Sequence, residues 1–321
     1  MMLKRLLTNN KYLFNYQIYR FSSIPFNQIF TENHIKDFQQ NGCTLVHNVV
    51  SEEMIDELIK QCSKIMKSNN FMENRVCFSK GEVETAKSFI DSGDQIGFFF
   101  EPNVFDENNN LKVPEDQVLN KMGHALHDID PVFERFSYRP LLQYILNQLG
   151  YQKPQCVQSM YIFKNQRVGT PVPPHSDNTF LITIPQSSAI GFWFALHDAK
   201  IENGCMWGIQ GSHKNPTTHF CYRTEKGDQF YIEGKEKEYD VEKAVPIEVK
   251  RGSMFIFHGD YVHLSKHNES SKPRHAYALH FIDSQGCKWH ERNWLQRRSH
   301  LPFRDYNQVV SKLQPTTTQQ V

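Results

Sequence analysis

The chain changes from helical to β-type hydrophobic spacing about halfway along its length. Thr31 is placed to cap a short helix that ends at Gly42, and the apolar residues 43–50 predict a strand. Ser51 begins a stronger predicted helix, because two glutamates follow it in the first turn. The apolar residues of that helix recur at the 3.6-residue period and predict one buried face: Met54, Ile55, Leu58, Ile59, Cys62, Ile65 and Met66.

A second helical region is expected over residues 116–149, where the apolar positions are Val132, Phe133, Leu141, Leu142, Ile145 and Leu149. Beyond this region the apolar runs become short, and Gly, Pro, Asn and Ser separate them: 156–164, 179–184, 189–197, 204–209, 253–258 and 274–283. Such runs are typical of an all-β sandwich or barrel. Residues 225–243 carry charges of both signs and predict a solvated hairpin or loop.

These elements predict one domain over residues 27–306, with a helical N-terminal part packed on a β-core from about residue 155. Residues 307–321 form a tail. Residues 1–26 are basic, contain no acid and include Arg-Phe-Ser-Ser at 20–23, so they resemble a mitochondrial presequence. A disordered tail is the alternative. We therefore expect an intracellular protein, mitochondrial if the segment targets and cytoplasmic otherwise.

Composition removes several classes of function. The chain has 36 Lys+Arg against 35 Asp+Glu, and this balance argues against a nucleic-acid partner. No apolar run approaches the roughly 18 residues that cross a bilayer, so no membrane span is expected. The seven cysteines include no C-x-x-C pair, which predicts reduced and mostly buried thiols rather than a zinc ribbon. A small-molecule substrate remains as the expected partner.

The 15 histidines suggest a metal site, but the simplest motif does not identify it. Residues two apart on an extended segment point the same way, so a His-x-acid pair can share one ion. About 1.6 such pairs are expected by chance in a chain of this composition. The chain has three: His175/Asp177, His258/Asp260 and His267/Glu269.

The surrounding sequence favours the first pair. A facial iron site needs two histidines and one carboxylate, which leaves three positions open. His175 and Asp177 follow a Pro-rich turn at 171–174, and His263 on a distant strand is the candidate second histidine. Arg274 follows at the start of the next strand, where its planar guanidinium can bind both oxygens of a carboxylate.

The other two pairs lack this context. The His258 pair is followed by no second histidine with an arginine on the strand after it, and the His267 pair lies in a polar turn. We therefore interpret four histidines as structural or surface residues: His258, His267, His275 and His280.

Several longer stretches resemble the phytanoyl-CoA dioxygenase family. The end of its domain is matched by residues 252–265 and 274–281, and its metal-binding turn by Pro-Pro-His-Ser-Asp-Asn at 173–178. Other stretches resemble the subgroup of short phytanoyl-CoA dioxygenase domain-containing proteins: 92–101, 120–127, 159–164, 202–207 and 293–296. The resemblance covers roughly residues 30–306.

This resemblance implies a mainly β fold with flanking helices, built on a double-stranded β-helix (jelly-roll) core. It implies iron(II) as the metal, with 2-oxoglutarate and O2 as co-substrates. The implied iron ligands are His175, Asp177 and His263. The implied co-substrate contacts are Lys121, Met160, Trp193, Ser265 and Arg274, with Arg274 on the distal carboxylate. Taken alone, Lys121 would be a surface residue, Met160 and Trp193 core residues, and Ser265 a turn hydroxyl.

The implied reaction hydroxylates a small-molecule or lipid-like substrate and releases succinate and CO2. Phytanoyl-CoA itself is not carried over as the substrate. The alternatives are a non-catalytic jelly-roll binding protein and a cupin-like isomerase, and Arg274 argues against both. We interpret Phe98–Phe100 as part of a buried strand, and the alternative is a wall of the substrate pocket.

Overall fold

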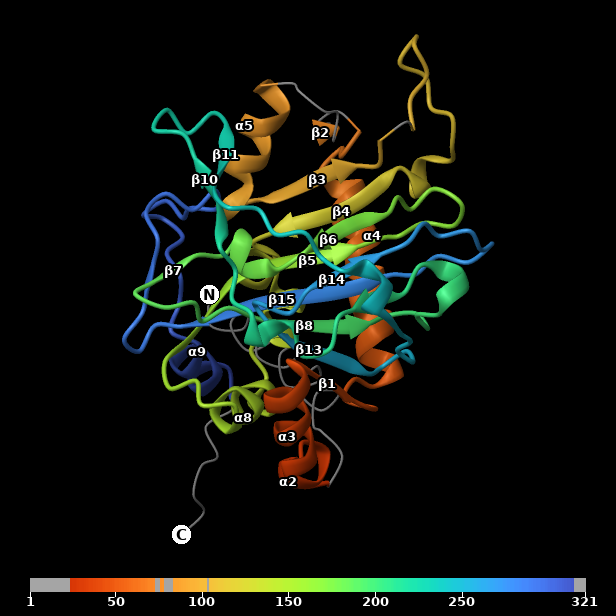
Figure 1. Ribbon diagram of the computed structural model, residues 1–321. Coiled ribbons are helices and arrows are strands. Elements are labelled where there is room, and N and C mark those ends of the chain that lie inside the picture. Colours follow the sequence, from red (N-terminus) through yellow and green to blue (C-terminus); the bar gives the residue numbers. More distant parts are fainter. Residues whose placement is uncertain (1–23, 73–75, 78–82, 103, 315–321) are drawn as a thin grey trace, which may run out of the picture.

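Two β-sheets face each other, and helices cover the outer side of the larger one (Figure 1). The computed structural model describes residues 24–72, 76–77, 83–102 and 104–314. Most of the predicted targeting segment at 1–26 therefore lies outside the described residues, as do residues 315–321. The prediction that 307–321 is a tail is wrong for its first half, because helix α9 (Tyr306–Leu313) buries Val309 and Val310 against the domain. Among the described helices, none is long and apolar enough to cross a membrane.

The larger sheet has eight strands in the order β1-β13-β8-β15-β5-β4-β3-β2. Its neighbouring strands are antiparallel except for the parallel β2–β3 pair. The strands are β1 (Cys43–Val46), β2 (Val76–Cys77), β3 (Ile96–Phe100), β4 (Leu119–His124), β5 (Pro154–Ile162), β8 (Ile190–Ala195), β13 (Met254–His258) and β15 (Ala276–Asp283).

The smaller sheet has four strands in the order β12-β9-β14-β6. These are β6 (Val172–His175), β9 (Met206–Gly208), β12 (Val245–Ile247) and β14 (His263–Ser265). Met206 of this sheet packs with Trp193 and Ala278 of the large sheet in one apolar cluster, so the two sheets close over a shared interior. This arrangement of two facing sheets is a double-stranded β-helix, as the sequence predicts.

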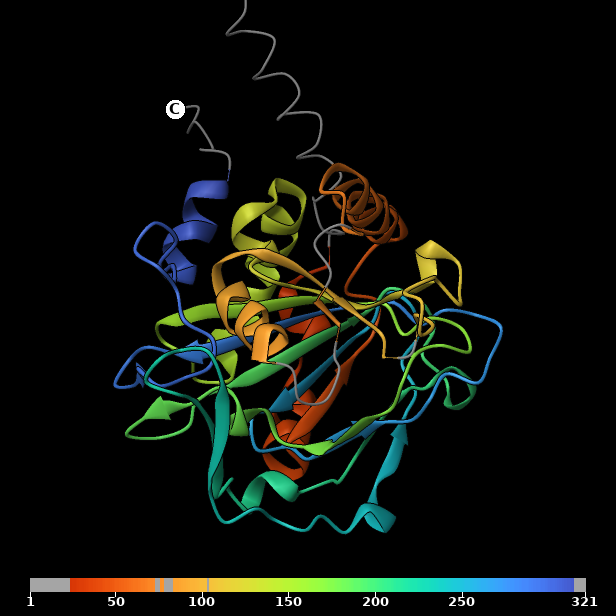
Figure 2. The same ribbon diagram turned by 90° about the horizontal axis from the view of Figure 1, so that it is seen from above.

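Helices form a layer on the other side of the large sheet (Figure 2). Ser51 caps α4 by accepting a hydrogen bond of 3.3 Å from the Met54 amide, and the predicted apolar stripe of this helix is buried. The described helices are α2 (Phe26–Ile29), α3 (Glu32–Asn41), α4 (Glu52–Ser68), α5 (Val83–Asp91), α6 (Leu126–Ile129), α7 (Pro131–Ser137), α8 (Pro140–Gln148) and α9 (Tyr306–Leu313). Of these, α4, α7, α8 and α9 supply buried residues to this layer. The main hydrophobic core lies between this layer and the sheet.

Two pairs of short strands complete the described structure. β10 (His219–Arg223) and β11 (Phe230–Gly234) form a hairpin within the region where charges of both signs predict a hairpin or loop. β7 (Thr183–Ile184) pairs with β16 (Lys288–Trp289). The six cysteines whose side chains are described are all buried, in agreement with the sequence-based expectation.

Three predicted boundaries are wrong. Residues 119–124 of the predicted helical region form strand β4 instead, because this segment completes its hydrogen bonds between β3 and β5. The first predicted strand ends at Val46 rather than at residue 50. The Pro-rich segment 171–174 is largely strand β6, which lies at the edge of the small sheet where a proline costs no ladder hydrogen bond.

The prediction that the β-core starts near residue 155 is also incomplete. Strands β1, β3 and β4 precede this residue and belong to the large sheet. The helices that the N-terminal half contributes therefore alternate with strands of the core. Apolar periodicity identifies those helices but does not report the pairing partners of such short strands.

Candidate metal and co-substrate site

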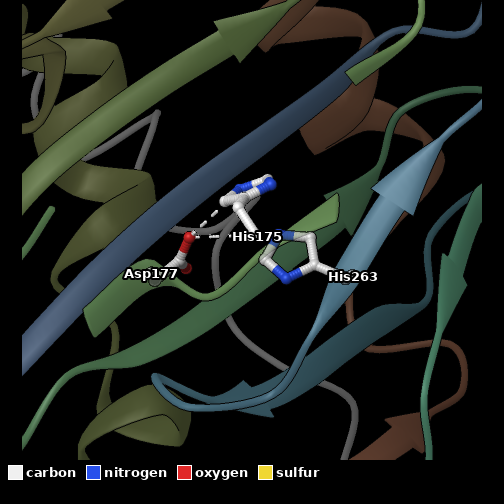
Figure 3. Close-up of side chains that lie close together, drawn as sticks. All are labelled: His175, Asp177 and His263. Atoms are coloured by element: carbon white, nitrogen blue, oxygen red, sulfur yellow. Dashed lines mark ion pairs between the residues drawn. The ribbon is translucent and has the colours of Figure 1, made fainter. Parts of the chain in front are cut away.

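His175 and His263 face each other across the pair of strands that forms one edge of the small sheet. The register of β6 and β14 places the two residues directly opposite, and their ring centroids lie 4.3 Å apart. Asp177 follows β6 in a short 3-10 turn, Asp177–Thr179. All three side chains point toward one another (Figure 3).

Backbone carbonyls orient both imidazole rings. His175 Nδ1 lies 2.9 Å from the carbonyl oxygen of Pro173, and His263 Nδ1 lies 3.0 Å from that of Tyr261. Because a carbonyl oxygen only accepts, each Nδ1 carries the proton and each Nε2 keeps its lone pair. These Nε2 atoms lie 3.6 Å and 3.9 Å from Asp177 Oδ1.

Burial and neighbouring groups keep the donors in the states that a metal needs. Burial lowers the pKa of His263 to about 4, so this imidazole is neutral at pH 7. Burial alone would raise the pKa of Asp177, but contacts with His280, His175 and His263 hold it well below its usual range. The site therefore presents a neutral imidazole at His263 and a carboxylate at Asp177.

The geometry of these donors fits one metal ion. A ligand atom from each of the three residues lies within 4.8 Å of the others. Bond lengths of about 2.1 Å at right angles would place such atoms about 3 Å apart, so a small inward movement suffices. Two histidines and one carboxylate are the donor set of a facial iron(II) site. The residues predicted from the sequence are thus brought together.

The carboxylate has a further contact that sequence reasoning missed. His280 of β15 is buried and its Nε2 lies 3.0 Å from Asp177 Oδ2, the oxygen that the other two histidines do not approach. His280 is therefore a structural residue and not a surface one, and its contact with the Asp177 carboxylate was not predicted. The only sequence signal for it is its position six residues after Arg274.

The remaining His-x-acid pairs do not join this cluster. His258 Nδ1 accepts a hydrogen bond of 3.0 Å from the Asp260 amide and lies 3.8 Å from the Asp260 carboxylate. His275 Nδ1 lies 2.9 Å from the Tyr161 hydroxyl, on the side of the sheet that the helices cover. Among the described residues, only the His175 cluster brings three potential metal ligands together.

Arg274 lies at the end of the interior between the sheets. Its side chain is buried, and Nη2 donates a hydrogen bond of 2.9 Å to the Gly204 carbonyl. Its guanidinium carbon is 5.2 Å from the centre of the Trp193 ring, which is a cation–π contact. Burial lowers its pKa to about 10, so the group stays charged at pH 7.

The Arg274 guanidinium has no acid to neutralise it within the described part of the chain. No carboxylate there forms an ion pair with it, and its buried Nε has no hydrogen-bond partner. A buried cation in this state is suited to an anionic ligand. The surroundings of Arg274 therefore fit the carboxylate of a co-substrate.

Strand register places three of the other predicted contacts on one face of the large sheet. Met160 pairs with Ala278, and Ala278 pairs with Trp193, so Met160 and Trp193 lie on the same face. Lys121 pairs with Ile162, two residues after Met160, and shares this face. The same face packs against the small sheet.

Lys121 also lies among aromatic rings. Its Nζ is 5.1 Å from the centre of the Phe89 ring and 5.8 Å from that of Phe99. Burial lowers its pKa to about 8. The alternative interpretation of Lys121 as a surface residue is therefore wrong.

The aromatic run Phe98–Phe100 forms most of strand β3, and all three residues are buried. The rings of Phe98 and Phe100 pack on Phe71 in the main core. This supports the favoured interpretation of the run as a buried strand.

Ser265 lies on β14 two residues after His263, and its Oγ is 2.9 Å from Lys164 Nζ.

Comparisons with known proteins agree with this geometry. Residues 38–276 match the family phytanoyl-CoA dioxygenase (PhyH). The chain is 40% identical to phytanoyl-CoA dioxygenase domain-containing protein 1 of Danio rerio, over 86% of this chain and 98% of that one. It is 38% identical to a phytanoyl-CoA dioxygenase of Arabidopsis thaliana, over 83% and 94% of the two chains.

Solved structures of low identity share the fold. The α-ketoglutarate-dependent carbocyclase SnoK matches with a TM-score of 0.58 at 16% identity, over 88% of this chain and 99% of SnoK. EctD from S. alaskensis, solved with 2-oxoglutarate and 5-hydroxyectoine, matches with a TM-score of 0.57 at 16% identity, over 88% of each chain. From its sequence matches, the chain belongs to the phytanoyl-CoA dioxygenase family.

Proposed function

We propose that this protein is an iron(II)- and 2-oxoglutarate-dependent dioxygenase that hydroxylates a small-molecule or lipid-like substrate and releases succinate and CO2. The observation that carries the proposal is the cluster of His175, Asp177 and His263, set in the same interior as the buried cation Arg274. Related structures contain iron or 2-oxoglutarate, which supports the same assignment.

Each residue has a defined task in this proposal. His175 and His263 present Nε2 to the iron because their Nδ1 protons are held by backbone carbonyls. Asp177 presents Oδ1, while its second oxygen is held by His280. When bound, iron(II) would supply chelation of a 2-oxo acid and activation of oxygen.

The co-substrate is oriented by groups at the other end of the interior. Arg274 is placed to bind its distal carboxylate, and Trp193 limits the movement of the guanidinium by packing against it. Met160, Trp193 and Lys121 line the face opposite the small sheet. The apolar cluster between the sheets would limit the access of water to the co-substrate.

The two alternatives make different demands on Arg274. A cupin-like isomerase and a non-catalytic binding protein need no buried cation for a second carboxylate. Here Arg274 is 2% exposed, and its guanidinium has no acidic partner among the described residues. The cost of burying an unpaired charge favours a function that brings a carboxylate to this position.

An anaerobic absorbance titration tests the proposal. Iron(II) and 2-oxoglutarate together should give the native protein a weak charge-transfer band at roughly 500 nm, which reports 2-oxo acid chelation at an open-sited metal. Arg274→Ala should need about 10-fold or more 2-oxoglutarate for half of this signal, with little change in iron affinity. Absence of the band from the native protein would reject the proposal.

The substrate and the hydroxylation require a separate experiment. A panel of small metabolites and lipid-like acids would be screened for compounds that stimulate succinate release by the iron-loaded protein. The product of any active compound would be weighed by mass spectrometry for one added oxygen. Stimulated succinate release without an oxygenated product would contradict the hydroxylation.

A further inference from the structure

Lys164 is a second buried cation near Arg274, and the sequence marks it only as the last residue of the family-like stretch 159–164. It follows strand β5 by two residues, and its carbonyl accepts a hydrogen bond of 3.1 Å from the Arg274 amide. The same carbonyl accepts a second hydrogen bond of 2.9 Å from Asn268 Nδ2. Its backbone has a φ of 38°, which costs free energy for a residue with a side chain. The position is thus fixed by several contacts.

The ammonium group of Lys164 contacts one of the predicted co-substrate residues. Nζ donates to Ser265 Oγ at 2.9 Å and to the Thr170 carbonyl at 2.6 Å, and the residue is only 3% exposed. Because Ser265 Oγ accepts this hydrogen bond, its own proton is left to donate elsewhere. The lysine therefore decides the direction of the serine hydroxyl.

Glu101 is the candidate counter-ion of Lys164, but its carboxylate already accepts hydrogen bonds from another residue. Glu101 accepts hydrogen bonds from Thr170, at 2.6 Å from Oγ1 and 3.3 Å from the amide, so it holds the loop rather than the ammonium group. Across the described ranges, no acid forms an ion pair with Lys164. Burial, together with the charge of Arg274, lowers the pKa of Lys164 to about 7. A carboxylate bound beside it would favour its charged form.

Gly204 connects the two cations. Its carbonyl accepts the hydrogen bond from Arg274 Nη2. A Cβ atom added to Gly204 would lie 2.8 Å from Lys164 Cε, so only a glycine leaves space for the methylene chain of Lys164. Two positive side chains and one hydroxyl thus converge where the distal carboxylate of a dicarboxylic acid is expected.

We propose that Lys164 is a positioning residue of the 2-oxoglutarate site, which turns the Ser265 hydroxyl toward the distal carboxylate and adds a second positive charge beside Arg274. The inference rests on the proposed function and extends it to a residue outside the implied contact set. Lys164 acts through Ser265 and through its charge, without touching the iron or the reacting atoms.

Binding of two 2-oxo acids to Lys164→Met tests this role. 2-Oxoglutarate has a distal carboxylate, and 2-oxovalerate lacks it but chelates a metal in the same way. Affinity would be measured anaerobically with iron(II) by absorbance, and with manganese(II) by calorimetry. We expect Lys164→Met to weaken the binding of 2-oxoglutarate by about 10-fold to 100-fold. Binding of 2-oxovalerate should weaken by less than about 2-fold.

Three controls make the result specific. Lys153→Met removes an exposed lysine just before the same strand and should leave both affinities unchanged. On a Ser265→Ala background, Lys164→Met should reduce the affinity for 2-oxoglutarate by a smaller factor than it does in the native protein. The reason is that the hydroxyl through which Lys164 acts is already absent. If Lys164→Met does not fold, Lys164→Gln keeps a donor for Ser265 without the charge and should show a smaller loss of the same selectivity.

The outcomes separate this inference from the proposed function. A native protein that binds neither acid would reject the proposed function itself. A native protein that prefers 2-oxoglutarate, with the same preference after Lys164→Met, would overturn only the role of Lys164. Equal weakening of both acids would also overturn it, since that result indicates general damage to the site.

Discussion

The two faces of the large sheet both contain buried residues but differ in chemistry. Along β15, Tyr277 and Leu279 point toward the helices and are fully buried in the main core. Ala278 and His280 alternate with them, point toward the small sheet, and are 3% and 4% exposed. Tyr277 and Leu279 fill the main core. On the other face the small Ala278 leaves space between the sheets, and His280 contacts the Asp177 carboxylate.

This difference shows that burial alone does not distinguish a packing residue from a site residue. The outer face, toward the helices, consists of large aromatic and aliphatic side chains such as Phe192 and Phe194. The inner face, toward the small sheet, mixes small residues with Lys121, Met160 and Trp193. We expect substitutions on the outer face to change stability and those in the interior between the sheets to change ligand binding.

The largest effect is expected from His263→Ala, which removes a metal ligand opposite the inner face. Loss of an outer partner of a ligand costs up to about 100-fold, so loss of the ligand itself should reduce succinate formation by more than that. His175→Ala should behave in the same way. Both variants should keep the native circular dichroism spectrum.

The matched control is His267→Ala, which removes a histidine of the same His-x-acid motif outside the cluster. Its iron-dependent turnover of 2-oxoglutarate should equal that of the native protein. Unchanged turnover in His263→Ala would refute the ligand assignment and, with it, the distinction between the two faces.

Phe194→Ala should show the opposite pattern on the outer face. The Phe194 ring is fully buried and meets the Phe136 ring edge-on at 5.0 Å. Its loss should lower the free energy of unfolding by about 3–5 kcal/mol, as cavities left by aromatic residues do. Urea denaturation measures this change, while 2-oxoglutarate affinity of the folded fraction should not change. A large loss of affinity would break the comparison.

His280→Leu should weaken the metal site without emptying it. It removes the contact of 3.0 Å between His280 Nε2 and Asp177 Oδ2 and leaves all three ligands in place. We expect iron(II) affinity to fall by about 10-fold to 100-fold, measured by competition with a chelating dye. His280→Gln keeps an N–H at a similar distance from the backbone and should restore part of the affinity; equal losses in both variants would argue for packing alone.

The smallest expected effect is the pH dependence of stability that His275 contributes on the outer face. Burial, together with the charges of His197 and Arg274, lowers the pKa of His275 to about 3, against 6.5 for an ordinary histidine. Below pH 6.5 the unfolded chain binds a proton that the folded protein does not, so the stability due to this residue falls as pH decreases toward 3. Between pH 7.5 and 5.5 it should contribute a loss of about 1 kcal/mol.

Urea denaturation of the native protein and of His275→Leu at these two pH values measures this contribution. The variant should lose less stability on acidification, whatever its stability at neutral pH. Parallel pH profiles for the two proteins would show that His275 is protonated in the folded state as readily as in the unfolded chain.

The sequence by itself determined much of the chemistry and the main helices. Ser51 and the apolar period after it fix α4, because capping and amphipathicity are local properties. The motif at His175 and Asp177, with His263 and Arg274 downstream, identifies the candidate site, and the family resemblance implies the same residues. Histidine and aspartate can bind a metal ion and arginine can bind a carboxylate, so the types and spacing of these residues predict a site without knowledge of the fold.

Only the tertiary structure decided which ordinary residues join that site. His280 and Lys164 lie far along the chain from their partners Asp177 and Ser265, and local sequence gives neither of them a function. Their roles depend on strand order and on register, since shifting a strand by one residue turns every side chain to the opposite face. Residues 119–124 became a strand for the same reason, because hydrogen bonds to β3 and β5 outweigh local preference.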